Sequence, residues 1–171
     1  MAVVTVNSTQ IANALSTPVV LSSPYLSGGN DINMVDNAVA GASDSAGSQY
    51  RYFRIPSNAR LDDIQVMNDA NTSGTSYKCG VYLINGGAVP VTYADQIFFS
   101  AVTMASARSV WTSLYAPTVL NGSYSPANVT KRVWELLGLS ADSETFYELV
   151  ITAVTAGSAG GNMAVRMSYV R

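Results

Sequence analysis

From residue 50 onward, apolar and polar positions alternate in short runs, and a turn signal follows most of them. A period of two residues is the pattern of a strand with one buried face. The clearest example is the last run, where Met163, Val165, Met167 and Tyr169 alternate with small or polar residues. The predicted strands cover residues 50–55, 61–67, 77–84, 146–154 and 163–170, with a shorter return at 89–91. Several short strands and few helices indicate an antiparallel β-sandwich.

Two short helical segments interrupt the predicted strands. Thr92 and Asp95 have the spacing of a capping box, which predicts a helix from there through Val102. A second helix is predicted over residues 130–137, ended by Gly138. Both segments are too short to be stable alone, so we expect them to pack on a sheet or to close one end of the sandwich.

The first 48 residues have a different composition. They contain two prolines and the Gly28-Gly29 pair, and their charged residues are three aspartates, without lysine or arginine. Two β-prone runs, 3–6 and 19–21, lack sustained periodicity. We therefore predict an extended N-terminal arm, or loosely paired edge strands, over residues 1–48 and a β-sandwich domain over residues 49–171. An arm this apolar should be covered by a partner or by its own domain.

The composition leaves few groups for catalysis. The chain has no histidine, one cysteine, and 12% charged residues, while 48% of it is hydrophobic. Histidines are the usual proton shuttles and metal ligands near neutral pH, and thiolates are the usual strong nucleophiles. Cys79 lies in an apolar run and is predicted to be a small buried hydrophobe. We therefore predict a structural or binding protein with no enzymatic activity, no metal and no cofactor.

Two acidic patterns leave alternatives open. Glu144 and Glu148 lie on or near one strand with even spacing, as a glycoside-hydrolysing pair would. A solvated strand edge is the favoured interpretation of both. Asp69, Asn71 and Ser73 match the first half of a calcium loop, but Gly80 stands where the bidentate glutamate is needed. A polar turn capped by its own side chains explains that pattern as well.

The net charge and the positions of the aromatic residues indicate which classes of binding partner to expect. A net charge of −2 gives no overall attraction for nucleic acid or for anionic membranes, so neither is expected as a partner. The longest apolar runs are too short for a signal or membrane helix. Tyrosine and tryptophan rings stack on sugars, but four tyrosines occupy strand positions where cross-strand packing is the default: Tyr50, Tyr52, Tyr82 and Tyr147.

Four segments resemble a known family when taken in order: RYFRIPSNARLDDIQV (51–66), CGVYLINGGAV (79–89), ADQIFFSAV (94–102) and KRVWELLGLSAD (131–142). Together with the closing MAVRMSYVR, they resemble the small virion proteins of tailed bacteriophages that are described as capsid cement or decoration proteins. The resemblance covers residues 50–171 and consists of packing and turn residues.

The resemblance implies an all-β, jelly-roll-like antiparallel sandwich with one or two short helices. It further implies a protein made in the host cytoplasm that binds the outside of the phage head. There it would bridge major capsid subunits, as a homodimer or homotrimer. We expect capsid or oligomer contacts at these residues: Val3, Val19, Val20, Leu21, Tyr25, Leu26, Arg51 and Arg54. The two arginines could equally form ion pairs on the sheet surface. The alternative function is a tail-associated or receptor-binding module that recognises a host glycan through exposed tyrosines and tryptophans.

Overall fold

The computed structural model describes residues 3–16, 26–28, 31–71, 76–84, 86–117, 125–157 and 159–171. The strands are β1 (Thr5–Asn7), β2 (Leu26–Gly28), β3 (Asp31–Ala40), β4 (Gln49–Pro56), β5 (Arg60–Asn68), β6 (Ser76–Leu83), β7 (Phe99–Thr103), β8 (Arg108–Ser113), β9 (Phe146–Ala153) and β10 (Gly161–Val170). The helices are α1 (Thr9–Leu15) and α2 (Val133–Leu136), with the 3₁₀ turns η1 (Ala94–Gln96) and η2 (Pro126–Thr130).

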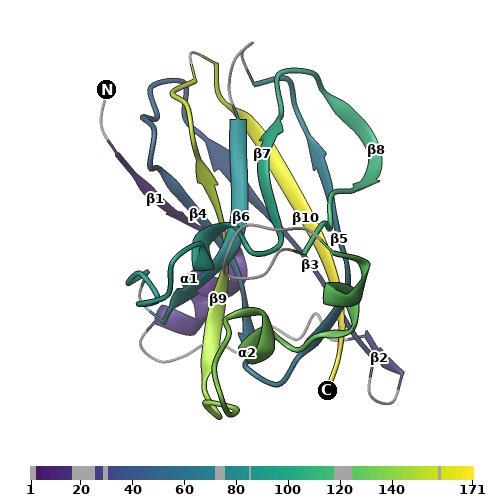
Figure 1. Ribbon diagram of the computed structural model, residues 1–171. Coiled ribbons are helices and arrows are strands. Elements are labelled where there is room, and N and C mark those ends of the chain that lie inside the picture. Colours follow the sequence, from purple (N-terminus) through teal and green to yellow (C-terminus); the bar gives the residue numbers. More distant parts are fainter. Residues whose placement is uncertain are drawn as a thin grey trace.

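The strands form two five-stranded sheets packed face to face (Figure 1). Sheet 1 has the order β1-β4-β9-β6-β7, and sheet 2 has the order β2-β3-β10-β5-β8. All neighbours are antiparallel except β1, which pairs with β4 in parallel. The prediction of an all-β antiparallel sandwich is confirmed.

The pairing of β3 to β10 defines the topology. The first of these eight strands pairs with the last, the second with the last but one, and so inward: β3 with β10, β4 with β9, β5 with β8, and β6 with β7. One long antiparallel ribbon is therefore folded over so that its strands are shared between two sheets. This arrangement is a jelly roll, and β1 and β2 extend it by one edge strand on each sheet.

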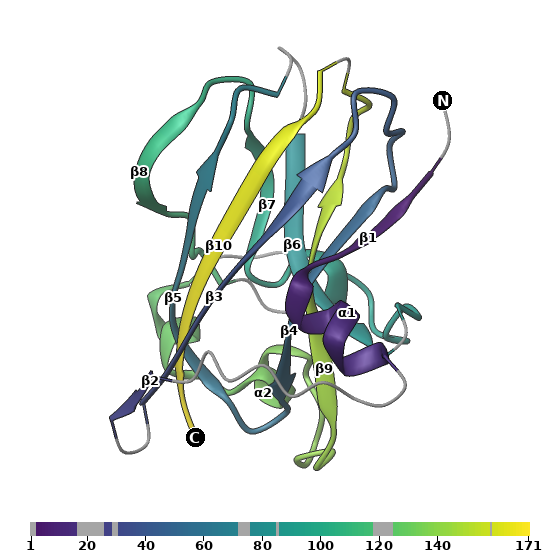
Figure 2. The same cartoon turned by 180° about the vertical axis from the view of Figure 1, so that it is seen from behind.

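Much of the segment before residue 48 belongs to the sandwich. β3 pairs with β10 over its whole length, and it lies inside sheet 2 rather than at its edge. Helix α1 packs against β4, β3 and β1 (Figure 2), and its Ile11 is buried. The description as edge strands fits β1 and β2, whereas the run 19–21 lies outside the described residues. The division of the chain at residue 48 stays a prediction.

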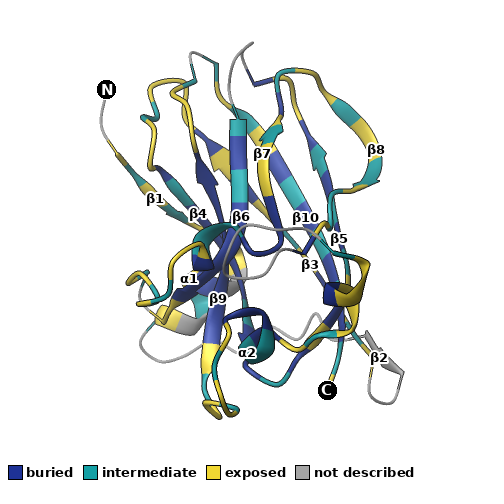
Figure 3. Ribbon diagram, in the orientation of Figure 1, coloured by how far each residue is buried: buried dark blue, intermediate teal, exposed yellow. Residues whose placement is uncertain are grey.

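The core lies between the two sheets, where the inward-facing side chains of both are buried (Figure 3). The alternation predicted for the last strand is confirmed, since Met163, Val165, Met167 and Tyr169 are all buried. Tyr52 joins the two sheets, because its hydroxyl donates a 3.1 Å hydrogen bond to the Met163 carbonyl. The four tyrosines predicted to pack across strands are buried, as expected.

The predicted helix from Thr92 to Val102 is wrong beyond residue 96. Only η1 is helical, no side chain caps it, and Tyr93 before it has a left-handed backbone with φ of 67°. The following residues join sheet 1 instead: the Phe98 amide donates to the Cys79 carbonyl, and Val102 pairs with Tyr77. Strand pairing thus overrides a local capping signal. The second helix is shorter than predicted, but Gly138 follows it with φ of 66°, as expected for its role.

Strands β3, β7 and β8 were not predicted from the sequence. The prediction of a short strand at residues 89–91 is wrong. The structure has an isolated β-bridge between Tyr82 and Ala88 just before these residues. The other predicted strands agree with the structure to within two residues at their ends.

The connection from β6 to β7 covers the outer face of sheet 1. Its turn η1 packs on β6 so closely that a Cβ at Gly80 would lie 2.1 Å from the Ala94 carbonyl oxygen. An ion pair between Lys78 on β6 and Asp95 in η1 also links these two elements. Gly80 is therefore required where a backbone segment crosses the strand.

We expect Gly80→Ala to lower the free energy of unfolding by about 3 kcal/mol, because the added methyl group displaces η1 from the sheet. A fall of this size corresponds to a decrease in Tm of roughly 10 °C, measurable by thermal unfolding. Gly87→Ala is the matched control, since its Cβ would make ordinary 3.7 Å contacts with Leu83. Equal Tm values for the two variants would contradict the proposed close approach.

Candidate functional site

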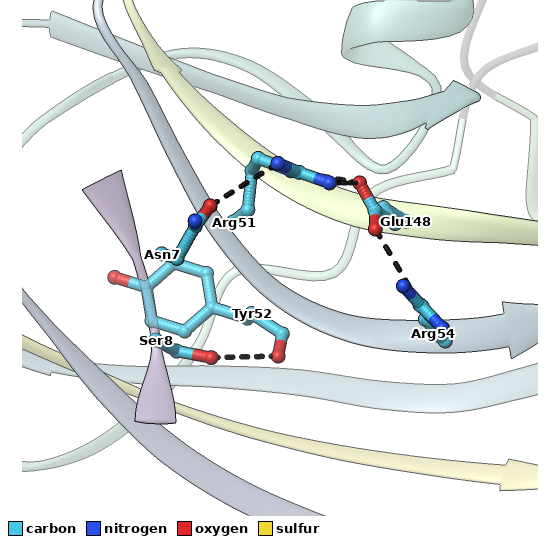
Figure 4. Close-up of polar contacts among 6 residues, drawn as sticks. All are labelled: Asn7, Ser8, Arg51, Tyr52, Arg54 and Glu148. Carbon is cyan, nitrogen blue, oxygen red and sulfur yellow. Dashed lines mark hydrogen bonds and ion pairs between the residues drawn. The ribbon is translucent and has the colours of Figure 1, made fainter. Parts of the chain in front are cut away.

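A buried ion network lies on the outer face of sheet 1 (Figure 4). Glu148 on β9 is fully buried, and its Oε2 accepts hydrogen bonds from both the Nε and the second terminal nitrogen of Arg51 on β4. Its Oε1 lies 3.5 Å from Nε of Arg54. Arg51 also donates to the Asn7 side chain at 3.2 Å, which ties β1 to the network. Oε2 is thus hydrogen-bonded to Arg51, whereas Oε1 has an ion pair with Arg54 but no hydrogen bond.

The interpretation of Glu148 as a solvated strand edge was wrong. The side chain is nevertheless completely buried, and it is paired with Arg51 and Arg54 instead of with water. Glu144 lies apart from it, in the turn before β9, where it is exposed and has a left-handed φ of 49°. The two carboxylates therefore do not form a pair facing a common cleft.

The remaining reactive groups have structural environments. Cys79 is completely buried, as predicted, and burial raises the pKa of its thiol well above the usual value. In the turn that matched half a calcium loop, Asp69 accepts two 2.8 Å hydrogen bonds from Asn162, and Asn71 is buried. Ser73 lies outside the described residues. Within the described ranges, no three His, Cys, Asp or Glu side chains gather at one place.

Exposed aromatic residues are scarce in the part of the chain that the structure describes. Of its tyrosines and tryptophans, Tyr93 is the exposed one. Trp111 lies beneath the guanidinium of Arg166, 5.0 Å from the ring centroid. No helix in the described segments is long and apolar enough to cross a membrane.

The outer face of sheet 2 is an accessible surface of regular structure. Figure 2 shows β3, β10 and β5 in front of the other sheet. On β3, Val35 and Val39 are 48% and 56% exposed. The register places Val35, Arg166 and Gln65 side by side across three strands. A shallow groove of about 400 Å³ crosses this row and is also lined by Asn33, Asp63 and Ser168.

The charges on this face are held by their neighbours. Arg166 donates to Gln65 at 3.1 Å and lies on Trp111. Asp63 accepts 2.6 Å hydrogen bonds from Gln65 and from the Ser113 hydroxyl. Such a network fixes the side chains before a partner arrives, which lowers the entropy lost on binding. We take the outer face of sheet 2 as the candidate interaction surface.

The predicted contact residues are dispersed. Val3 is 65% exposed beside β1, and Leu26 is in edge strand β2. Arg51 and Arg54 form ion pairs with Glu148, as in the alternative prediction that they pair on the surface of the sheet. The other four lie outside the described residues: Val19, Val20, Leu21 and Tyr25. Sequence reasoning missed Val35 and Val39, whose alternation with Met34, Ala38 and Ala40 gives a weak strand signal because two of the inner residues are small.

Comparison with known proteins gives structural matches alone. No protein-family model matches the chain, and no curated protein matches it. A chain in the capsid of Ralstonia phage GP4 is similar over 98% of this chain and 97% of its own, with a TM-score of 0.62 and 13% identity. A chain in the capsid asymmetric unit of cyanophage Pam1 is similar over 91% and 95%, with a TM-score of 0.53 and 16% identity. The chain therefore has a fold similar, over nearly its whole length, to that of chains in two phage capsid structures.

We expect Glu148→Gln to destabilise the fold by about 3 kcal/mol, because it leaves two arginines without a buried counter-charge. Denaturant unfolding measures this loss, and Glu144→Gln, at an exposed position, should change stability by less than about 0.5 kcal/mol. The double variant Arg51→Met/Glu148→Leu should recover much of the loss, since it removes the two buried charges together and leaves Arg54, whose side chain is 31% exposed. A double variant no more stable than Glu148→Gln would contradict this account.

Proposed function

We propose that the chain is a non-enzymatic virion structural protein of the cement or decoration type. In this proposal it binds the outside of a phage head and stabilises it by bridging major capsid subunits. The observation that carries the proposal is the similarity of the fold, over nearly the whole chain, to chains in two phage capsid structures. At these identities the similarity concerns the fold, so the function needs the further support given below.

The distribution of covered and accessible surface supports a binding role. The charged side chains of sheet 1 are covered and paired, whereas sheet 2 presents a preorganised face with few charges. A flat sheet face of small, apolar and hydrogen-bonding side chains suits contact with another protein surface. We therefore propose that the outer face of sheet 2 contacts the capsid.

Self-association is part of the proposal. A homodimer or homotrimer would present two or three copies of this face to neighbouring capsid subunits. Linking several modest contacts raises avidity by roughly 10²–10⁴ without any new contact. Binding only to the assembled shell would stabilise the shell by mass action. The contacts expected from the sequence remain proposed in addition to the face of sheet 2: Val3, Val19, Val20, Leu21, Tyr25, Leu26, Arg51 and Arg54.

The alternative function is a tail-associated module that recognises a host glycan. Its sequence-based expectation was a cluster of exposed tyrosines and tryptophans beside Asn and Asp. Tyr93 is the exposed aromatic of this kind among the described residues. The capsid proposal is therefore preferred, and the glycan alternative becomes one outcome of the test.

We expect the purified protein to co-sediment with expanded heads that lack it and to raise the temperature at which those heads release DNA. Val35→Glu and Val39→Glu should weaken this binding at least roughly tenfold, because each would bury an unpaired carboxylate in the contact. The matched control is Val154→Glu, at a valine 41% exposed beyond the end of β9.

If the wild-type protein does not co-sediment with the heads and gives specific hits on a glycan array, the glycan alternative replaces the capsid proposal. Unchanged head binding by both sheet 2 variants would remove this face from the mechanism while leaving the capsid role intact. Light scattering of the free protein tests the oligomer, and a monomer at all concentrations would contradict the homodimer or homotrimer.

A further inference from the structure

A second groove, of about 450 Å³, lies at the end of the sandwich where β10 ends and α2 begins. Its walls are held by backbone hydrogen bonds, from the Val133 amide to the Ala59 carbonyl at 2.9 Å and from the Trp134 amide to the Ser57 carbonyl at 3.0 Å. On the opposite wall, Arg60 pairs with Val170 in the register of sheet 2. The groove is therefore built on a rigid frame.

Three arginines line this groove: Arg60, Arg132 and Arg171. The other four arginines of the chain have side-chain partners: Arg51 and Arg54 with Glu148, Arg108 with Asn68, and Arg166 with Gln65. Within the described residues, none of the three groove guanidinium groups donates a hydrogen bond or forms an ion pair. The arginines without a hydrogen-bond or ion-pair partner among the described residues are thus gathered in one place.

The local charge is opposite to that of the whole molecule. The groove carries three arginines against one glutamate, Glu135, while the chain has a net charge of −2. One oxygen of that glutamate is occupied, because it accepts a 2.7 Å hydrogen bond from the Arg132 amide. Guanidinium groups are planar forks that match carboxylate and phosphate groups, so the groove selects an anion.

Two polar atoms in the wall identify the kind of anion. The indole nitrogen of Trp134 and Oδ1 of Asn58 are both buried without a hydrogen-bond partner. The first is a donor and the second an acceptor, and each unmade hydrogen bond costs about 1–3 kcal/mol. A peptide offers both complements, a carboxylate or carbonyl oxygen and a backbone N–H, whereas a phosphodiester backbone has no N–H. A side-chain rotation in the wall is needed for a ligand to reach these covered atoms.

The surroundings also disfavour a polyanion. A neighbouring hollow shares Asn58 and Arg171 with the groove and is lined by Asp142 and Glu144. Hydrogen bonds from the Ser57 hydroxyl and the Glu144 amide lower the pKa of Asp142, so it is charged at neutral pH. A continuous chain of phosphates would meet these carboxylates, while a short acidic segment fits within the basic groove.

We propose that this arginine groove binds an acidic peptide segment of a partner protein. Aspartate or glutamate carboxylates of the segment pair with Arg60, Arg132 and Arg171, and its backbone N–H meets Asn58. The inference does not depend on the capsid role, because a peptide titration needs no viral head.

The test is a titration of the ¹⁵N-labelled 171-residue protein with an end-blocked triglutamate peptide, which offers one carboxylate for each groove arginine. The chain has two tryptophans, so two indole N–H signals report on two places. We expect the Trp134 signal to shift saturably and the Trp111 signal, on sheet 2, to stay fixed. The triple variant Arg60→Gln/Arg132→Gln/Arg171→Gln should weaken the affinity roughly tenfold or more. Among the described residues these guanidinium groups make no hydrogen bond or ion pair, and Arg132 loses only a longer-range attraction to Asp142, so the variant should unfold within a few degrees of the wild-type temperature.

The single variants Arg132→Gln and Arg108→Gln change the net charge equally, and only the first should weaken binding. End-blocked triglutamine, the uncharged control, should leave the Trp134 signal unshifted. An unmoved Trp134 signal, or equal affinity in the triple variant, would overturn the proposal. Tighter binding of a dT₁₂ oligonucleotide through the same arginines would reassign the groove to nucleic acid. A Trp134 shift that follows protein concentration without peptide would reassign it to contact between copies of this chain.

Discussion

The structure depends on the placement of β10, which pairs along its length with β3 on one side and with β5 on the other. Its partner β3 is more than a hundred residues away in sequence, so the two sheets can form only after most of the chain is available. Non-local pairing of this kind makes folding slow compared with helical proteins. It also explains why residues 31–40 cannot be separated from the sandwich: without β3, the inner side chains of β10 would lose one flank of their sheet.

The sequence allowed the sandwich and five of its strands to be predicted, because their buried positions are large apolar residues, alternating along β10 and in dense runs along β4 and β9. Strand β3 escaped, since Ala38 and Ala40 fill its inner positions and are too small to give a clear signal. Strand β7 was hidden by the capping spacing of Thr92 and Asp95, and its place is decided by pairing with β6. Edge strand β8 was not predicted because none of its side chains is fully buried, so its sequence has no clear apolar alternation.

The candidate surfaces were less predictable than the fold. Glu148 was expected in water because nothing in its local sequence indicates that Arg51 and Arg54 converge on it from β4. The face formed by Val35, Arg166 and Gln65 needs the register of three strands, which alternation alone does not supply. The same holds for the arginine groove, whose members come from β5, the segment before α2 and the end of β10. Alternation assigns a side chain to a face, but it does not assign its neighbours.

The outer faces of the two sheets differ in their exposure to solvent. Sheet 1 carries a covered, ion-paired outer face that contributes to stability, and sheet 2 leaves its outer face accessible. Both the sheet 2 face and the arginine groove are built on paired strands or backbone hydrogen bonds rather than on long loops. Surfaces of this kind change little when a partner binds, which favours repeated, identical contacts.

The burial of Cys79 has a practical consequence. It is the single cysteine of the chain, and its side chain is enclosed between the sheets with a raised thiol pKa. Maleimide reagents attack thiolates that they can reach, so the folded protein offers them no target. A cysteine introduced at a solvent-exposed position would then be the sole attachment point for a fluorophore or spin label, without removal of the native one.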